Sequence, residues 1–196
     1  GTTNCLLKFG EGTRHRPDGA EGAIGYRIGA AGSGLAQMFQ MMNEARISVG
    51  LGAAALAVRG YRHALAYAQE RPQGRPLGAK DPAAKPCAII EHADVKRMLL
   101  VQKAWAEGAL ALILYCADLI DRETVATDPA EKNRAAALLG LLTPVAKSWP
   151  SEFGLAANDL AIQIHGGYGY TRDFDVEQFY RDNRLNPIHE GTHGIQ

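Results

Sequence analysis

The chain has 196 residues, of which 46% are hydrophobic, and its 21 Lys and Arg side chains are balanced by 21 Asp and Glu side chains. This length fits one domain, or one domain with an appendage, and is sufficient to bury a sizeable core. The balanced charge provides no general attraction to nucleic acid or to a membrane surface, so we expect neither as a partner.

The longest unbroken apolar run covers residues 109–117, about half of the ~18 residues that a membrane span requires. The first residues lack the basic segment and apolar core that indicate a signal peptide. Three cysteines, Cys5, Cys87 and Cys116, are odd in number and widely spaced, which argues against a disulfide framework. We therefore expect a reduced, cytoplasmic protein.

Residues 1–34 differ in pattern from the rest of the chain. The segments NCLLKFGEG and GAIGYRIG are short apolar runs between glycines, which predict strand pieces and turns. The glycines at 29 and 34 have the spacing of a phosphate-binding loop, but Leu35 follows where that loop needs a lysine. A turn into the first helix is the better interpretation. Because the chain starts without methionine and ends at GIQ, we expect a piece of a larger protein.

Two long helices are predicted next. From Leu35 onward, apolar residues recur at spacings of three and four, most regularly from Ile47 to Ala68, and Pro72 should end this helix near Arg71. A Pro- and Gly-rich connector follows. The second helix should run from about residue 89 to 122, and its middle is apolar nearly all round, which is typical of the centre of a bundle.

A third helical region is predicted from about Ala130 to His165, with Pro144 and Pro150 expected to kink or interrupt it because each removes a backbone donor.

A fourth helix should run through Arg184, opened by Asp175 and Gln178 as an N-cap pair. The sequence thus predicts a mainly α protein, with an antiparallel four-helix bundle at 35–196 that follows a short remnant of a β domain at 1–34.

The segment from His189 to His193 fits the H-E-x-x-H pattern of zinc peptidases. That site needs both histidines on one helix and a third ligand, for which His165 or Glu177 would be upstream donors. Gly191 and the glycine at 194 weaken such a helix. We therefore favour the alternative, in which Glu190 is a carboxylate at a glycine turn. A partly apolar setting there would suit a general base, but the residues alone favour a solvated loop carboxylate.

A second glycine-rich segment, QIHGGYGY, follows the third helix. Gly166, Gly167 and Gly169 permit a close approach of the backbone to a ligand, whereas a plain helix end explains only one of them. This segment is the second candidate binding region.

These two glycine-containing segments resemble those of a known protein family. QIHGGYGYTRDFDVEQFYRDNR followed by IHEGTHGIQ resembles the C-terminal signature of the acyl-CoA dehydrogenase family, and NEARISVGLGAAALAVRGYRHALAYAQER and IIEHADVKRMLL resemble its preceding helices. The resemblance covers nearly all of residues 35–196. The details ERPQGR, HGGYGY and EGTHGIQ are most similar to the branch of 3-(methylthio)propionyl-CoA dehydrogenase-like enzymes.

The resemblance implies a flavoenzyme with an N-terminal helical domain, a middle β domain and a C-terminal four-helix bundle, of which this chain is the last part. It implies that Glu190 removes the α-proton of an acyl-CoA thioester while a β-hydride passes to FAD, which gives a 2-enoyl-CoA. Gly191 would lie beside the substrate and Thr192 near the flavin. His189 replaces the aromatic residue that usually precedes the glutamate.

Other site residues are also implied by the resemblance. Asn43 and Arg46 match positions beside the acyl-CoA. Arg71 matches an arginine on the FAD pyrophosphate of a neighbouring subunit, and Gln163, Gly166 and Gly167 match the segment that holds the adenosine-diphosphate half of FAD across a dimer interface.

The expected partners are an acyl-CoA thioester, electron-transfer flavoprotein as electron acceptor, and further copies in a homodimer or homotetramer. Two alternatives remain open: an acyl-CoA oxidase-like flavoenzyme that passes electrons to oxygen, and a non-catalytic or DNA-associated relative, which would need a basic face. We expect the isolated fragment to be inactive.

Overall fold

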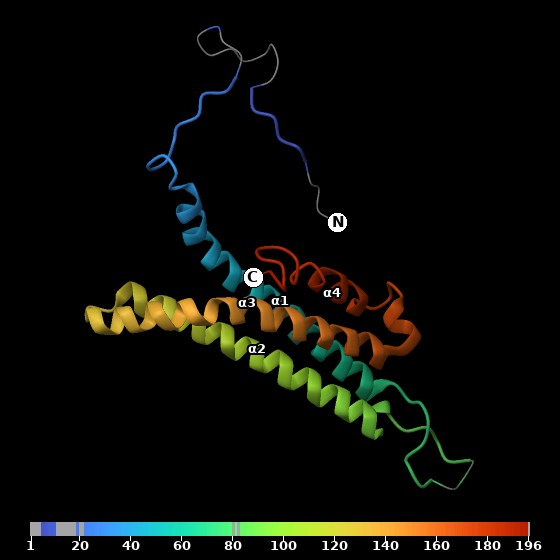
Figure 1. Ribbon diagram of the computed structural model, residues 1–196. Helices are drawn as coiled ribbons and strands as arrows, with labels where there is room; N and C mark the ends of the chain where they lie inside the picture. The colour runs from blue at the N-terminus through green and yellow to red at the C-terminus, as the bar shows by residue number, and fades with distance from the viewer. Residues whose placement is uncertain (1–4, 11–18, 20–21, 80, 82, 196) are drawn as a thin grey trace. The chain divides into compact units, whose positions relative to one another are not determined.

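The computed structural model describes residues 5–10, 19, 22–79, 81 and 83–195, and the chain divides into two compact units, Gly1–Phe39 and Gln40–Gln196. The described residues are mainly helical, as predicted (Figure 1). The four α-helices are α1 (Gly34–Glu70), α2 (Ala93–Val125), α3 (Pro129–His165) and α4 (Val176–Asn183). Two short 3-10 helices, η2 (Ile89–Glu91) and η3 (Gly166–Tyr170), precede α2 and follow α3.

The ends of the long helices follow local chemistry. α1 ends one residue before Arg71-Pro72, as proline predicts. α3 begins where the side chain of Asp128 accepts a hydrogen bond of 3.0 Å from the backbone N–H of Ala130, with Pro129 in the first turn. The connection between α2 and α3 is short, so the two helices lie antiparallel and side by side (Figure 1).

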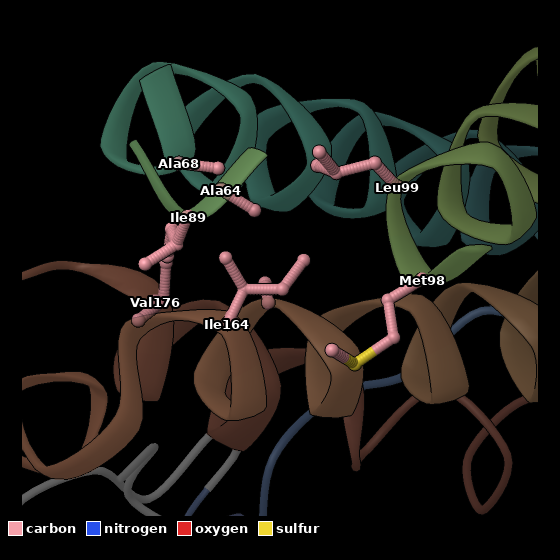
Figure 2. Packing of buried hydrophobic residues seen from close by; sticks show 8 residues of the cluster. Ala64, Ala68, Ile89, Met98, Leu99, Ile164 and Val176 are labelled. Carbon is pink, nitrogen blue, oxygen red and sulfur yellow. The ribbon is translucent and has the colours of Figure 1, made fainter. Parts of the chain in front are cut away.

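The main core cluster joins all four helices within the second unit. Figure 2 shows side chains from α1, η2, α2, α3 and α4 pointing toward one another between the helices. Its buried members are Ala64, Ala68, Ile89, Met98, Leu99, Ala161, Ile164 and Val176. The alanines of α1 permit close approach, while the larger residues of α2 and α3 fill the space between helices. Burial of such side chains stabilises the bundle by about 1.5–3 kcal/mol for each large residue.

α3 is not interrupted at Pro144 or Pro150, because one helix runs from Pro129 to His165, and a kink at these residues stays a prediction. Pro150 has no N–H for the carbonyl of Ala146, four residues earlier. That carbonyl instead faces Gly50 of α1, where a β-carbon would lie only 2.0 Å from the oxygen. The two helices therefore approach so closely at this point that residue 50 must lack a β-carbon.

A chain of buried amides fixes the segment after α4. Nδ2 of Asn183 donates to Oδ1 of Asn158 at 2.7 Å, and Nδ2 of Asn158 donates to the carbonyl of Leu56 at 2.9 Å. Asn186 in turn donates to Oδ1 of Asn183 at 2.9 Å. These bonds connect α1, α3, α4 and the following turn, so residues 184–195 start from a fixed position.

The prediction that Asp175 and Gln178 cap the N-terminus of α4 together is wrong. Asp175 precedes the helix, but its backbone is already helical and its side chain makes no capping hydrogen bond. Gln178 instead donates to Oδ1 of Asp182 at 2.6 Å, because residues four apart lie on one helical face.

The strand pieces expected in residues 1–34 are not assigned in the described part of that range, where no partner strand is available for pairing. The glycine-rich segment there forms the predicted turn, in which the backbone N–H of Ser33 donates to Ala30 at 3.3 Å.

One described helix, α2, is long and apolar enough to cross a membrane by length and composition, yet its buried face packs against α3 and α1 in the bundle core.

Candidate active site and cofactor pocket

Glu190 lies in the series of turns that follows α4. Its φ is 54°, and it is the one residue other than glycine with a positive φ among the described residues. This left-handed conformation is strained for a residue with a side chain. Gly191 follows with a φ of 109°, a value that glycine adopts at little cost. The turn therefore presents a half-buried carboxylate on a backbone that other contacts must hold.

The geometry does not support the zinc interpretation of the same residues. His189 and His193 lie in turns and bends rather than on one helix, so they do not share a helical face. Within the described ranges, no group of three or more His, Cys, Asp or Glu side chains is placed to hold a metal ion. His193 instead caps the turn, since its backbone N–H donates to the carbonyl of Pro187 at 3.1 Å.

Two cations hold the backbone of this turn. Nε of Arg46, on α1, donates to the carbonyl of Glu190 at 3.4 Å, and Nζ of Lys147, on α3, donates to the carbonyl of Gly191. The predicted residues Arg46, Glu190 and Gly191 are therefore brought together. Lys147 was not predicted, because a single lysine in a helical pattern normally indicates a solvated face.

Burial perturbs two groups at this turn. It lowers the pKa of Lys147, and Arg46 lowers that pKa further, whereas the carboxylate of Glu190 raises it. Burial likewise lowers the pKa of His193, assisted by Lys147 and opposed by Glu152. The charged groups that contribute to these two pKa shifts lie within electrostatic range of one another.

The other residues predicted near the substrate lie close to this turn in sequence or on α1. The hydroxyl of Thr192 donates to the carbonyl of Ile188 at 2.7 Å, which tightens the turn. Asn43 lies one helical turn before Arg46 and is exposed. It lines a groove of about 490 Å³ between α1, the end of α2 and the start of α3.

The predicted cofactor residues converge at the other end of α3. Arg71, Gln163 and Gly166 line one pocket of about 420 Å³, and Arg71, Gly166 and Gly167 line an adjoining pocket of similar size. A β-carbon at Gly166 or Gly167 would meet no atom within 4 Å, so both glycines present open backbone. Cζ of Arg71 lies 5.6 Å from the centre of the Tyr168 ring, and its buried Nε has no hydrogen-bond partner.

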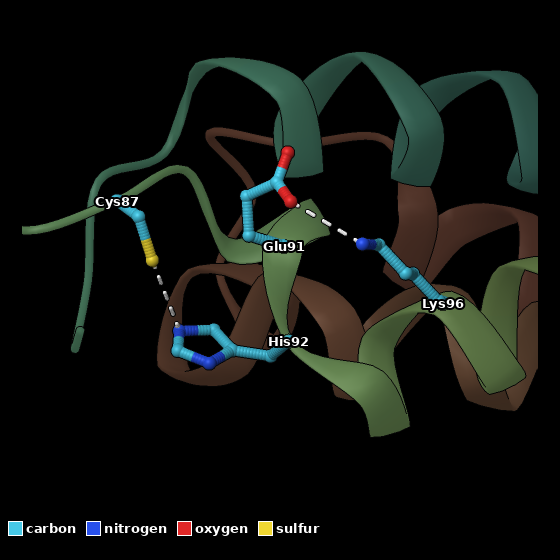
Figure 3. A network of polar contacts seen from close by, with 4 residues as sticks. All are labelled: Cys87, Glu91, His92 and Lys96. Carbon is cyan, nitrogen blue, oxygen red and sulfur yellow. Dashed lines mark hydrogen bonds and ion pairs between the residues drawn. The ribbon is translucent and has the colours of Figure 1, made fainter. Parts of the chain in front are cut away.

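The connector between α1 and α2 fixes the rim of this pocket. Pro72 and Ala88 form an antiparallel bridge, and the backbone N–H of Gln73 donates to Cys87 at 2.9 Å. Nε2 of His92 lies 2.7 Å from the carbonyl of Gln73 and 3.9 Å from Sγ of Cys87, the contact drawn in Figure 3. These contacts hold the chain beside Arg71 in one place.

His165 is a pocket residue whose role was not recognised from the sequence. It is buried, its ring stacks on Tyr67 with centroids 4.3 Å apart, and Nδ1 lies 2.7 Å from the carbonyl of Ala161. Burial lowers its pKa, and His63 adds to this effect, while the backbone hydrogen bond opposes it. A neutral ring that donates from Nδ1 leaves Nε2 as an acceptor.

The two clusters are well separated within the chain. Lys147 contacts the Glu190 turn, whereas Gln163 lies in the pocket with Arg71. These two positions are 16 residues apart on the same helix, which corresponds to roughly 24 Å at 1.5 Å per residue.

Known proteins resemble this chain over nearly its whole length. A family model described as the acyl-CoA dehydrogenase C-terminal domain matches residues 32–196. The chain belongs to the acyl-CoA dehydrogenase family. Over its full length it is 40% identical to the 3-methylmercaptopropionyl-CoA dehydrogenase of Ruegeria pomeroyi, of which it covers 33%. It spans about a third of the length of the curated relatives that it matches.

Solved structures of acyl-CoA dehydrogenases have the same fold. The Bacillus anthracis acyl-CoA dehydrogenase complexed with FAD superposes with a TM-score of 0.70 at 25% identity, covering 85% of this chain and 28% of that one. The Caenorhabditis elegans protein ACDH-11, solved in complex with C11-CoA, gives a TM-score of 0.74 at 25% identity, covering 88% and 27% of the two chains. The family and the helical fold predicted from the sequence are confirmed.

Proposed function

We propose that this chain is the C-terminal helical part of an FAD-dependent acyl-CoA dehydrogenase. In this proposal, Glu190 removes the α-proton of an acyl-CoA thioester, a hydride leaves the β-carbon, and the product is a 2-enoyl-CoA. The observation that carries the proposal is the Glu190 turn, in which two cations from different helices hold consecutive carbonyls around a half-buried carboxylate.

The turn suits a general base for chemical reasons. The α-proton of a thioester is weakly acidic, so the base must be positioned accurately and shielded from water. The backbone of Glu190 and Gly191 is held by Arg46 and Lys147, which limits the positions that the carboxylate can take. Lys147, one of the two residues that hold the turn, is fully buried, and burial lowers its pKa.

The second cluster fits one part of FAD. When bound, FAD accepts the hydride that leaves the substrate. The guanidinium of Arg71 has a buried Nε without a partner, and a planar donor of this kind suits a pyrophosphate. Gly166 and Gly167 offer backbone unobstructed by side chains, and Gln163 and Nε2 of His165 offer polar atoms beside them. These residues would hold the adenosine-diphosphate half of the cofactor.

The separation of the clusters supports an assembly of subunits. Because roughly 24 Å lies between the α3 positions at the two clusters, we propose that each cluster serves a different FAD molecule, with Arg71 acting on the cofactor of a neighbouring subunit. The enzyme would then be a homodimer or a homotetramer. We further propose electron-transfer flavoprotein as the electron acceptor and a cytoplasmic location, which the unpaired cysteines favour.

The test uses the full-length protein that contains this chain, purified with its cofactor. We expect flavin absorbance in the visible spectrum and its bleaching when an acyl-CoA is added without oxygen. Glu190→Gln should keep the flavin spectrum and lose the bleaching, whereas Glu107→Gln, an exposed carboxylate on α2, should behave as the wild type.

Two results would contradict the proposal. A colourless protein, or bleaching that survives in Glu190→Gln, would refute the assigned cofactor or the assigned base. Rapid return of the colour on admitting air would instead indicate the oxidase-like alternative.

A further inference from the structure

Lys147 stands apart from the other charged residues of the chain. Its relative exposure is 0%, and it is the largest of the fully buried side chains in the described residues. An ammonium group is costly to remove from water unless it is paired and hydrogen-bonded. Its Nζ reaches across from α3 to the carbonyl of Gly191, the residue that follows Glu190. A fold that retains this group at this place uses it for a specific contact.

The contact acts on a strained part of the backbone. Glu190 holds a φ of 54°, a conformation that persists only where the surroundings enforce it. Arg46 supplies one restraint at the carbonyl of Glu190, and Lys147 supplies the next at the carbonyl of Gly191. With one donor on each of two successive carbonyls, the peptide between these residues cannot rotate without breaking a charge-assisted hydrogen bond.

Resting on the proposed function, we propose that Lys147 is a positioning residue for Glu190. Its ammonium holds the Gly191 carbonyl, so that the carboxylate stays aimed at the substrate, and it adds a fixed positive charge beside the base. Lys147 is not itself placed against the reacting atoms, and it acts through the turn.

The charges around Lys147 come from every element packed at the turn. Arg46 approaches from α1, Glu190 and His193 belong to the turn itself, and Glu152, on α3, acts on His193. Glu190 is the one carboxylate among them that acts directly on Lys147. Glu190 and His193 are therefore the two groups of the turn that face the Lys147 charge.

The test is Lys147→Met in the full-length holoenzyme, because methionine retains much of the length and volume while removing the charge and the donor. We expect kcat/KM to fall about 10- to 100-fold, the effect of one charge-assisted hydrogen bond. The acid limb of the kcat/KM profile should move to higher pH, because the carboxylate loses a neighbouring cation. Exchange of substrate α-hydrogens with D2O should slow in parallel. Lys103→Met, the same change on the exposed face of α2, should alter none of these.

A merely structural role would not move the acid limb or the exchange rate in this way. The proposal would be overturned if Lys147→Met kept the wild-type kcat/KM. It would also be overturned if kcat/KM fell while the acid limb of the pH profile and the rate of α-hydrogen exchange stayed unchanged. If Lys147→Met does not yield folded holoenzyme, Lys147→Gln keeps a neutral donor and is judged by the same shift of the acid limb. The wild type is assayed first: its failure to be bleached by acyl-CoA would refute the proposed function itself, and the role of Lys147 with it.

Discussion

Substitution of Gly50 by alanine probes the contact between α1 and α3. Gly50 is buried, and an added β-carbon would lie 2.0 Å from the carbonyl oxygen of Ala146 and 2.8 Å from Cδ1 of Ile113. Real β-carbons essentially never approach another heavy atom within 3.0 Å, so the oxygen must retreat by about 1 Å. Because this oxygen belongs to the backbone of α3, no rotation of a side chain can relieve the clash.

The magnitude follows from two opposing effects. Alanine in place of glycine inside a helix stabilises the folded state by about 0.5–1 kcal/mol where there is room. Overpacking a well-packed contact destabilises it by about 1–3 kcal/mol. At Gly50 the second effect dominates, and we expect a net loss of about 2 kcal/mol, which for a chain of this size lowers Tm by about 4–8 °C.

The control lies two residues away on the same helix. Gly52 is exposed, and a β-carbon there would meet no atom within 4 Å, so Gly52→Ala should raise the stability. Urea unfolding followed by far-ultraviolet circular dichroism measures both variants. We expect the two substitutions to change the free energy of unfolding in opposite directions. A Gly50→Ala protein that is more stable than the wild type would refute the close approach of α1 and α3.

Three further outcomes are expected. Asn158→Ala should lower the free energy of unfolding by about 2–3 kcal/mol, because it removes the buried hydrogen bonds of Asn158 to Asn183 and to the carbonyl of Leu56, and leaves the Asn183 amide only the carbonyl of Ala53 at 3.4 Å; a loss below about 0.5 kcal/mol in urea unfolding would contradict this. The pKa of His165 is lowered on folding. Its contribution to the free energy of unfolding is therefore fully present above the ordinary histidine pKa of about 6.5 and is lost as pH falls below that value. Thermal melts across this range should show a slope that His165→Gln reduces, and an equal slope in both proteins would count against the assignment. Burial also raises the pKa of the Cys116 thiol, so iodoacetamide should label exposed Cys5 much faster in the folded protein, and equal rates would show that the core is open.

The helices were predictable because their signals are local. The apolar spacing that ends before Pro72 fixes α1 within about two residues. The close approach of α1 and α3 was not predictable, because the carbonyl of Ala146, which Pro150 leaves without its helical donor, meets Gly50, about 100 residues earlier in the chain. Such a contact depends on how two helices pack, and neither segment alone carries a sign of it.

Some residues of the candidate site could likewise be recognised from the sequence, and others could not. Glu190 and the glycines at 166 and 167 occur in short, unusual segments, so the sequence alone marked them, and their roles stay predictions. Lys147 carried no such signal, since only the fold shows that its helical face is closed to water. His165 was considered only as a possible upstream zinc ligand, whereas its stacking on Tyr67 requires α1 and α3 to be brought together.

The distance along α3 between the two clusters has a genetic consequence. If the proposed assembly is correct, an allele altered at Arg71 damages the cofactor site of its neighbour, and an allele altered at Glu190 damages its own reaction centre. A mixed dimer of the two altered subunits still contains one site with an intact Glu190 and an intact Arg71 from different chains. Two inactive alleles, expressed together, would therefore restore part of the activity that neither produces alone.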